Sequence, residues 1–420
     1  MKLDLALQHD PLVPQRDALL DVDEIGRFLA RRVGVNKPVS LDACKRVATS
    51  YRIGKRVRVL YEIGVGDDRY LIAASTFRSA SRSERAFHAA MEDPTATGPL
   101  RPVVHDAELD TVFWTFPNDR RIAALPDVAR ASVALTRRLG RPWTKSRVVD
   151  YTPEVSAVVR CLDGAENTVA YAKVHSGDVG ERNHRTHRAL VQAARGSALR
   201  VPLPLAYSRH HHTLMVEPVR GRAVGHLEGL DLLTGLAAYG GALATLHSLP
   251  LPEALPGTRP VLERVRRKAA GIGVVRPDVE ALCDELLGEL EARWEQATGP
   301  LVLVHGDANA NNAIVEDGRV GLIDFERVAL GSAGSDIGKV LSLFAYQRAL
   351  GFITRVEEEE RAAAFLRGYS SVRDVPARSL VRVHTSAALA ERAFLAVSRL
   401  QPRPLRLVPT LLTEARELLK

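Results

Sequence analysis

The pattern of apolar and polar residues divides the chain into a β-rich first half and a helical second half. Residues 51–64 and 69–77 are rich in β-branched and aromatic side chains and flank Gly66-Asp67-Asp68, which indicates a β-hairpin. From residue 151 a similar pattern returns, with apolar strands expected over 151–164 and 168–176. We therefore predict two hairpins of the same design in the first half of the chain.

The two β-rich segments share an order of elements at an offset near 100 residues. Tyr51 corresponds to Tyr151, Thr111 corresponds to Thr213, and each segment carries one helix before its last two strands. Such self-similarity predicts an internal duplication of a five-stranded, one-helix unit. Because few positions are identical, two unrelated α+β segments remain the alternative.

Helical periodicity dominates after residue 230. Leu282, Leu286, Leu287 and Leu290 recur at the spacing of one helix face within residues 278–298. Among these helices, a short apolar strand at 301–304 and a hairpin over 313–323 are expected. The other helices predicted after residue 230 cover 232–249, 336–346, 357–369, 380–400 and 409–419, and one helix over 128–139 is predicted before the second β-rich segment.

The short strand before the second hairpin leads into the residues with the most usable chemistry. His305, Gly306 and Asp307 follow it directly, Asn312 comes five residues after the aspartate, and Asp324 ends the hairpin. One carboxylate for a substrate hydroxyl, with a carboxylate and an amide oxygen for Mg²⁺, is what phosphoryl transfer from a nucleotide requires. A simpler interpretation, in which the aspartates only cap turns, accounts for each residue singly but not for the set.

This spacing resembles the aminoglycoside phosphotransferase and choline-kinase-like family of the protein-kinase-like fold, whose catalytic loop reads H-G-D with an Asn five positions after the Asp. The resemblance implies an α+β bilobal fold with a β-rich small lobe and a mainly helical large lobe. It makes Asp307 the catalytic base, Asn312 and Asp324 the Mg²⁺ ligands, and His305 a residue that braces the catalytic loop. It also implies ATP or GTP as the phosphate donor.

The resemblance extends to the second β-rich segment. Lys173, in an apolar strand, occupies the position whose lysine pairs with the nucleotide phosphates, and Glu181 is the nearby candidate for its partner. The first segment has Ala73 or Ala74 opposite Lys173, so we expect it to act as a cap or scaffold. Thr152 to Val158, where the family covers the phosphates, contains no glycine. The residues that match the adenine-binding hinge are Met215, Val216, Glu217 and Pro218.

Composition limits the possible partners. The chain has 420 residues and a formal charge of +8, which favours anionic ligands such as nucleotides, but it has no basic strip with interleaved aromatics, so nucleic-acid binding is not expected. Its three scattered cysteines predict neither a disulfide framework nor a zinc site. No apolar run near the ~20 residues of a membrane span and no leader pattern are evident, which predicts a cytoplasmic protein without membrane contact.

These observations predict three parts: an N-terminal cap over 1–140 that is a possible degenerate copy of the small lobe, a nucleotide-binding small lobe over 141–221, and a helical catalytic lobe over 222–420. The predicted activity is Mg²⁺-dependent transfer of a nucleotide γ-phosphate to a hydroxyl of a small molecule, such as an aminoglycoside, an amino sugar, or another antibiotic or metabolite. Antibiotic resistance would be one use of such an enzyme. A kinase of peptide hydroxyls, and a nucleotide-binding regulatory module without transfer activity, remain alternatives.

Overall fold

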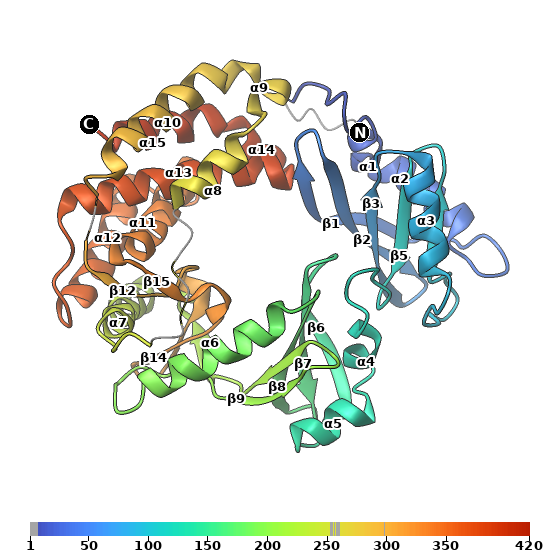
Figure 1. Cartoon of the computed structure of the whole chain (residues 1–420), viewed down its shortest axis with the longest axis horizontal. Helices are drawn as coiled ribbons and strands as arrows, with labels where there is room; N and C mark the ends of the chain where they lie inside the picture. Colours follow the sequence, from blue (N-terminus) through green and yellow to red (C-terminus); the bar gives the residue numbers. More distant parts are fainter. Residues whose placement is uncertain (1–6, 253–254, 256, 258–260, 298) are drawn as a thin grey trace.

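Two antiparallel five-stranded sheets with the same strand order form the first half of the chain (Figure 1). The computed structural model describes residues 7–252, 255, 257, 261–297 and 299–420. The first sheet has the order β1-β2-β3-β5-β4 and the second β6-β7-β8-β10-β9, as the predicted duplication requires. The strands are β1 (Ala43–Arg52), β2 (Arg56–Val65), β3 (Asp68–Thr76), β4 (Val103–Asp106) and β5 (Thr111–Thr115), then β6 (Lys145–Thr152), β7 (Ser156–Leu162), β8 (Thr168–His175), β9 (Pro204–Ser208) and β10 (Thr213–Val216). One helix links the third and fourth strands of each unit, α3 (Ala80–Ala90) and α6 (Val179–Ala193).

The repeat begins before its sheets, at an aspartate that holds the first hairpin of each unit. Asp10 and Asp119 each accept hydrogen bonds from a tyrosine hydroxyl and from the backbone N–H of the residue three positions after that tyrosine. The donors are Tyr51 and Gly54 for Asp10, and Tyr151 and Glu154 for Asp119. Two helices follow each aspartate, α1 (Arg16–Leu20) and α2 (Val22–Arg32) in the first unit, α4 (Leu125–Ala129) and α5 (Val133–Leu139) in the second. The repeated unit is thus longer than the sequence indicates.

The helices α4 and α5 belong with the second sheet. The sequence predicts one helix over 128–139, but Ala131 has a φ of +51°, which breaks the helix. Leucines and valines of α4 and α5 share a buried core with Ala157, Val159 and Ala172 of the second sheet. We therefore propose that the boundary between the N-terminal unit and the small lobe lies near residue 118, and not at 140 as predicted from the sequence.

Strand register corrects the residue assigned opposite Lys173. Lys173 pairs with Val158, whose equivalent in the first sheet is Arg58, and Arg58 pairs with Ser75. The first hairpin spans 75 − 58 = 17 positions between these partners and the second spans 173 − 158 = 15, so the first is two residues longer. Ser75, and not Ala73 or Ala74, therefore occupies the lysine position, and the first unit still lacks a cation there.

The rest of the chain is the helical large lobe. Its strands are β11 (Arg222–Ala223), β12 (Leu301–Val304), β13 (Ala313–Glu316), β14 (Arg319–Leu322) and β15 (Ala329–Ser332). Its α-helices are α7 (Gly229–His247), α8 (Val261–Ala269), α9 (Ile272–Val275), α10 (Glu280–Trp294), α11 (Ala333–Ala349), α12 (Arg355–Ser370), α13 (Arg378–Arg399), α14 (Pro402–Arg406) and α15 (Val408–Glu417). The predicted α+β architecture is confirmed: a β-rich small lobe, a mainly helical large lobe, and an additional N-terminal unit that resembles the small lobe.

Among the described residues one helix, α7, is long and apolar enough to cross a membrane by length and composition. This differs from the prediction that no apolar run approaches such a length. In the structure α7 packs against α12, and Leu236, Tyr239 and Leu243 lie in the core that both helices share. Burial inside the large lobe accounts for the apolar composition of α7.

The N-terminal unit contacts both lobes and closes a ring with them (Figure 1). Against the large lobe, β1 packs on α13, and the Arg46 side chain donates to the Leu400 carbonyl oxygen at 3.2 Å. Residues of the first sheet and of α8, α10, α13 and α15 form one continuous hydrophobic core. Against the small lobe, Arg56 and Arg58 of β2 contact the carboxylate of Glu154. The unit therefore ties the two lobes together.

Glu154 is expected to stabilise the junction between the N-terminal unit and the small lobe. Its side chain is 3% exposed and lies within 3.6 Å of Arg56, Arg58 and Arg120. Glu154→Gln would leave these arginines without their shared carboxylate, so we expect the free energy of unfolding to fall by about 3–5 kcal/mol. Urea unfolding at pH 7 measures this, with Glu166→Gln, an exposed partner of Lys145, as the matched control. Equal losses in both variants would contradict the role given to Glu154.

The same carboxylate gives this junction a predicted pH dependence. Burial by itself raises the pKa of Glu154, but the hydrogen bond and charge of Arg120, with Arg58 and Arg56, outweigh it and hold the pKa below its ordinary value. Because the folded state has the lower pKa, the stabilisation is present at neutral pH and is lost as the pH falls through that lowered pKa. Glu154→Gln should abolish this acid-side loss.

Candidate active site

One buried carboxylate fixes the loop that follows β12. Asp336, in the first turn of α11, accepts the backbone N–H of His305 at 2.6 Å and that of Gly306 at 2.9 Å. His247 of α7 lies against the same carboxylate at 3.2 Å. Gly306 has a φ of +75°, and a Cβ there would lie 2.1 Å from the carbonyl oxygen of Arg327. Only glycine fits this position, so the H-G-D sequence is the one that the loop geometry requires.

Hydrogen bonds between the loop after β12 and the end of the hairpin bring their polar residues together. Asn312 donates from its side-chain amide to the backbone oxygen of Asp307 at 3.1 Å, and its own carbonyl accepts the N–H of Ile323 at 2.9 Å. The His305 ring nitrogen Nε2 lies 2.9 Å from the Ile323 carbonyl oxygen. Asp324 follows with a φ of +66° and a ψ of +57°. Asp307, Asn312 and Asp324 thus lie on adjoining segments, at the place where the sequence pattern puts them.

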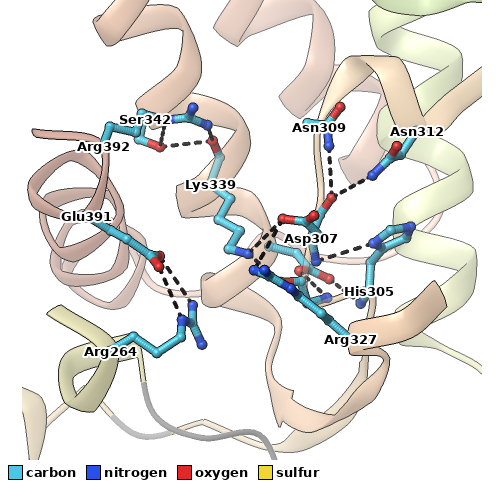
Figure 2. A network of polar contacts seen from close by, with 12 residues as sticks. Arg264, His305, Asp307, Asn309, Asn312, Arg327, Lys339, Ser342, Glu391 and Arg392 are labelled. Carbon is cyan, nitrogen blue, oxygen red and sulfur yellow. Dashed lines mark hydrogen bonds and ion pairs between the residues drawn. The ribbon is translucent and has the colours of Figure 1, made fainter. Parts of the chain in front are cut away.

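The carboxylate of Asp307 faces two cations (Figure 2). Lys339 of α11 lies 3.3 Å from Asp307 Oδ1 and also donates to the carbonyl oxygen of Gly306, while Arg327 lies 3.8 Å from the same carboxylate oxygen. Burial raises the pKa of Asp307, but the charges of Lys339 and Arg327 outweigh it and lower that pKa. The Asp307 side chain remains 40% exposed, so it is both ionised and accessible. Lys339 is not among the residues predicted from the sequence, although a lysine within the apolar run of α11 is a detectable signal.

Lys173 extends from β8 to the loop that carries Asp324. Its ammonium lies 2.7 Å from Asp324 Oδ1 and 2.7 Å from Glu326 Oε1. Burial lowers the pKa of Lys173, but Glu326 and Asp324 outweigh it and raise that pKa, so the side chain is a cation. Glu326 also lies 3.2 Å from His175. The structure therefore brings Lys173 to Asp324, and it adds Glu326 as a partner that the sequence analysis did not assign.

Glu181 does not pair with Lys173. Its carboxylate accepts a hydrogen bond from Arg209 at 2.6 Å. The face of α6 that is turned inward carries Gly180, Asn183 and His187, none of which is acidic. Glu181 stands one position away from that face because a helix advances about 100° per residue. The assignment of Glu181 to the nucleotide site is therefore corrected.

The predicted hinge residues differ in how they face the site. Side chains alternate along a strand, so Leu214 and Val216 share the face of Lys173, whereas Met215 points to the other face, where it is fully buried in the core with Ala172. The Met215 side chain therefore points away from the face that carries Lys173, and a contact between its backbone and the nucleotide base stays a prediction. Glu217 exchanges backbone and side-chain hydrogen bonds of 3.0 Å with Leu203.

A pocket of about 630 Å³ opens beside this hinge. Glu217 and Pro218 line it together with Tyr171, which lies two residues before Lys173 and therefore on the same face of β8. Arg200 and Arg220 give the pocket a positive character. Its size is suited to a small-molecule ligand, and an aromatic ring on the lysine face suits a planar base.

The donor atoms near Asp324 suit Mg²⁺ and not a metal held by the protein alone. Among the described residues, no group of three or more His, Cys, Asp or Glu side chains is placed to hold a metal ion. Asn312 uses its amide nitrogen toward Asp307, which leaves its side-chain oxygen for another partner, and its backbone oxygen accepts the N–H of Ile323, one residue before Asp324. One carboxylate and one amide oxygen are the kind of partial ligand set that Mg²⁺ completes with phosphate oxygens and water.

Comparison with known proteins agrees with this geometry. A family model described as "Phosphotransferase enzyme family" (APH) matches residues 156–374, just over half of the chain, including Lys173, the loop from His305 to Asn312 and Asp324. No curated protein sequence matches the chain.

Solved structures of similar fold cover about two thirds of the chain. Aminoglycoside phosphotransferase APH(4)-Ia is 15% identical, with a TM-score of 0.50, and the match covers 68% of this chain and 97% of that one. Aminoglycoside phosphotransferase APH(3'')-Id from Streptomyces rimosus is 20% identical, with a TM-score of 0.47 and coverage of 64% and 97%. An ethanolamine kinase from Plasmodium vivax is 14% identical, with a TM-score of 0.45 and coverage of 64% and 82%. At these identities the APH(4)-Ia match establishes the fold alone.

Proposed function

Since the chain belongs to the phosphotransferase enzyme family, we propose that it transfers the γ-phosphate of ATP or GTP, with Mg²⁺, to a hydroxyl of a small molecule. The observation that carries this proposal is the joint placement of Asp307, Asn312 and Asp324, with Lys173 at 2.7 Å from Asp324. These groups supply a base, two metal ligands and a phosphate-binding cation, which are the parts that phosphoryl transfer uses. The fold relatives include kinases of aminoglycosides and of ethanolamine, which supports a small-molecule acceptor.

We assign each side chain one task. Asp307, ionised and accessible, would accept the proton of the acceptor hydroxyl while the oxygen of that hydroxyl bonds to the γ-phosphorus. The bond between the γ-phosphorus and its bridging oxygen breaks, and the electron pair leaves with the nucleoside diphosphate. Asn312 and Asp324 would hold Mg²⁺, which supplies charge neutralisation at the phosphates. His305 and Asp336 keep the loop in place, so that little reorganisation is needed during transfer.

The nucleotide would lie between the lobes. Val216, Glu217 and Pro218 would border the base, and Lys173 would exchange its contacts with Asp324 and Glu326 for contacts with phosphate oxygens. A regulatory module without transfer activity is the second candidate, because Lys173 is already neutralised by these two carboxylates. Release of ADP that depends on an added acceptor would support the kinase, while nucleotide binding without any turnover across a broad acceptor panel would support the module.

Lys173 is expected to matter for nucleotide binding far more than an exposed lysine of the same lobe. A hydrogen bond to a charged group contributes about 1.5–3 kcal/mol, so Lys173→Ala should weaken nucleotide affinity about tenfold to a hundredfold. Lys145, whose side chain is 57% exposed and paired with Glu166, is the matched control. Calorimetric titration with an ATP analogue measures both variants. Equal, small changes would remove Lys173 from the site.

A further inference from the structure

The side of Asp307 that faces away from Asn312 carries an excess of positive charge (Figure 2). Five cationic side chains from three helices and one loop lie there with two carboxylates. We call this group the basic cluster: Arg264 and Lys268 of α8, Arg327, Lys339 of α11 and Arg392 of α13, with Asp307 and Glu391. The proposed phosphate and metal site uses Lys173, Asn312 and Asp324, and none of the cations on α8.

Within the basic cluster, five cations lie against two carboxylates, Glu391 and Asp307. Glu391 is shared between Arg264 at 3.4 Å and Lys268 at 3.2 Å, and these two side chains are 18% and 23% exposed. Arg392 donates to neutral oxygens, the Ser342 hydroxyl and the Lys339 carbonyl, each at 3.0 Å. A third carboxylate, Asp336, is already occupied by two backbone N–H groups and His247.

The pKa values of residues in the basic cluster also indicate an excess of positive charge. The pKa of Lys268 and that of Lys339 are both lowered, by burial first and then by the neighbouring cations, in spite of Glu391 and Asp307. The pKa of Glu391 is lowered to about 2, because Lys268 and Arg264 outweigh its burial. A site where cations are destabilised and carboxylates are strongly ionised favours the arrival of another anion.

We propose that the acceptor is an anionic hydroxyl compound, whose carboxylate or phosphate group binds at Lys268, Arg264 and Arg327 while its hydroxyl meets Asp307. This inference rests on the proposed function, since it assigns the acceptor of the same site. A polycationic aminoglycoside would bring like charges against this cluster, whose two carboxylates, Asp307 and Glu391, are already ion-paired. Arginine on α8 and at position 327 suits the recognition of carboxylate and phosphate oxygens by paired N–H donors.

Anion binding can be tested without knowledge of the acceptor. Inorganic phosphate is titrated calorimetrically into protein saturated with Mg²⁺ and a non-hydrolysable ATP analogue, so that the nucleotide phosphate site is filled. We expect saturable binding that Lys268→Gln, and separately Arg264→Gln, weaken about tenfold or more. Arg266→Gln is the matched control, because Arg266 lies on the same helix but pairs with Glu291 and is 52% exposed. Absence of saturable binding, or equal loss in the control, would overturn the proposal.

Acceptor charge is tested by ADP release with glucose, glucosamine, glucuronate, glucose 6-phosphate and kanamycin. Turnover of glucuronate or of glucose 6-phosphate alone identifies the carboxylate or the phosphate as the anionic group, and Glu391→Gln should then leave KM unchanged or lower. Turnover of a cationic compound with a KM that Glu391→Gln raises would refute the proposal, since Glu391 would then bind the acceptor. If none of these compounds turns over, the phosphate titration decides.

Failure of the proposed function is recognised separately, as absence of nucleotide binding to the folded protein or as nucleotide binding without turnover of any acceptor. The phosphate titration on nucleotide-free protein then still tests the basic cluster. Thermal unfolding of each variant tests whether its fold is intact.

Discussion

Asp307→Asn is expected to lower kcat by about a hundredfold to ten-thousandfold, the range that a positioned general base contributes. Asparagine has nearly the same shape as aspartate, but its amide cannot accept the proton of the acceptor hydroxyl. Nucleotide affinity should stay within a few-fold of the wild type, because Asp307 contacts Lys339 and Arg327 and not the predicted metal ligands through its carboxylate. Steady-state ADP release with a turned-over acceptor measures kcat, and titration with an ATP analogue measures affinity.

A fall in kcat without a loss of nucleotide affinity would identify Asp307 as the base. Loss of nucleotide binding together with turnover would indicate a collapsed loop, which thermal unfolding of the variant would reveal. Undiminished turnover of Asp307→Asn would refute the role given to this carboxylate.

Asp324→Ala is expected to abolish transfer and, unlike Asp307→Asn, to weaken binding of the Mg²⁺ nucleotide. The substitution removes the carboxylate of the proposed metal site and leaves a single amide oxygen, that of Asn312. It also removes one of the two ion-pair partners of Lys173, which keeps its ion pair with Glu326. Titrations with and without Mg²⁺ separate the two effects: the wild type should gain affinity with the metal, and the variant should gain little.

Glu326→Gln provides the matched comparison, because Glu326 touches the same lysine at the same 2.7 Å but has no proposed metal contact. It should retain the Mg²⁺ dependence of nucleotide affinity. A variant Asp324→Ala that keeps this dependence would move the metal site elsewhere.

The catalytic loop is predictable from sequence because its geometry is local. Five positions separate Asp307 from Asn312, and the hydrogen bond between them closes the loop by itself. The hairpin that follows ends at Ile323, whose N–H returns to the Asn312 carbonyl. Short-range spacing is therefore enough to place Asp307, the proposed base, beside the candidate metal ligands.

Assignments outside this loop fail where a shift of one residue along a strand or helix decides which side chain faces the site. The position equivalent to Lys173 shows this, because Ala74 and Ser75 are one residue apart and point to opposite faces of the strand. Glu181 fails for the same reason on a helix, where one step turns the carboxylate from Lys173 toward Arg209. Sequence spacing alone does not determine which face of an element is turned inward when both faces carry polar residues.

The basic cluster is beyond sequence reasoning for a different reason. Arg264 and Glu391 are 127 positions apart, and Lys339 lies between them in the chain on a third helix. The formal charge of +8 is spread along the sequence and indicates no such focus. Only the packing of α8, α11 and α13 concentrates it beside Asp307. The junction at Glu154 likewise depends on Arg56 and Arg58 of a separate unit.

The central claim is that this chain transfers phosphate with Asp307 as the base, and the most direct measurement follows the phosphate itself. Wild-type protein and Asp307→Asn are incubated with Mg²⁺, ATP labelled at the γ-phosphate and a small-molecule cell extract, and labelled organic products are separated and counted. We expect a labelled small molecule with the wild type, and a rate of its formation about a hundredfold or more lower with the variant. Equal labelling by both proteins, or nucleotide binding by the wild type without any labelled product, would contradict it.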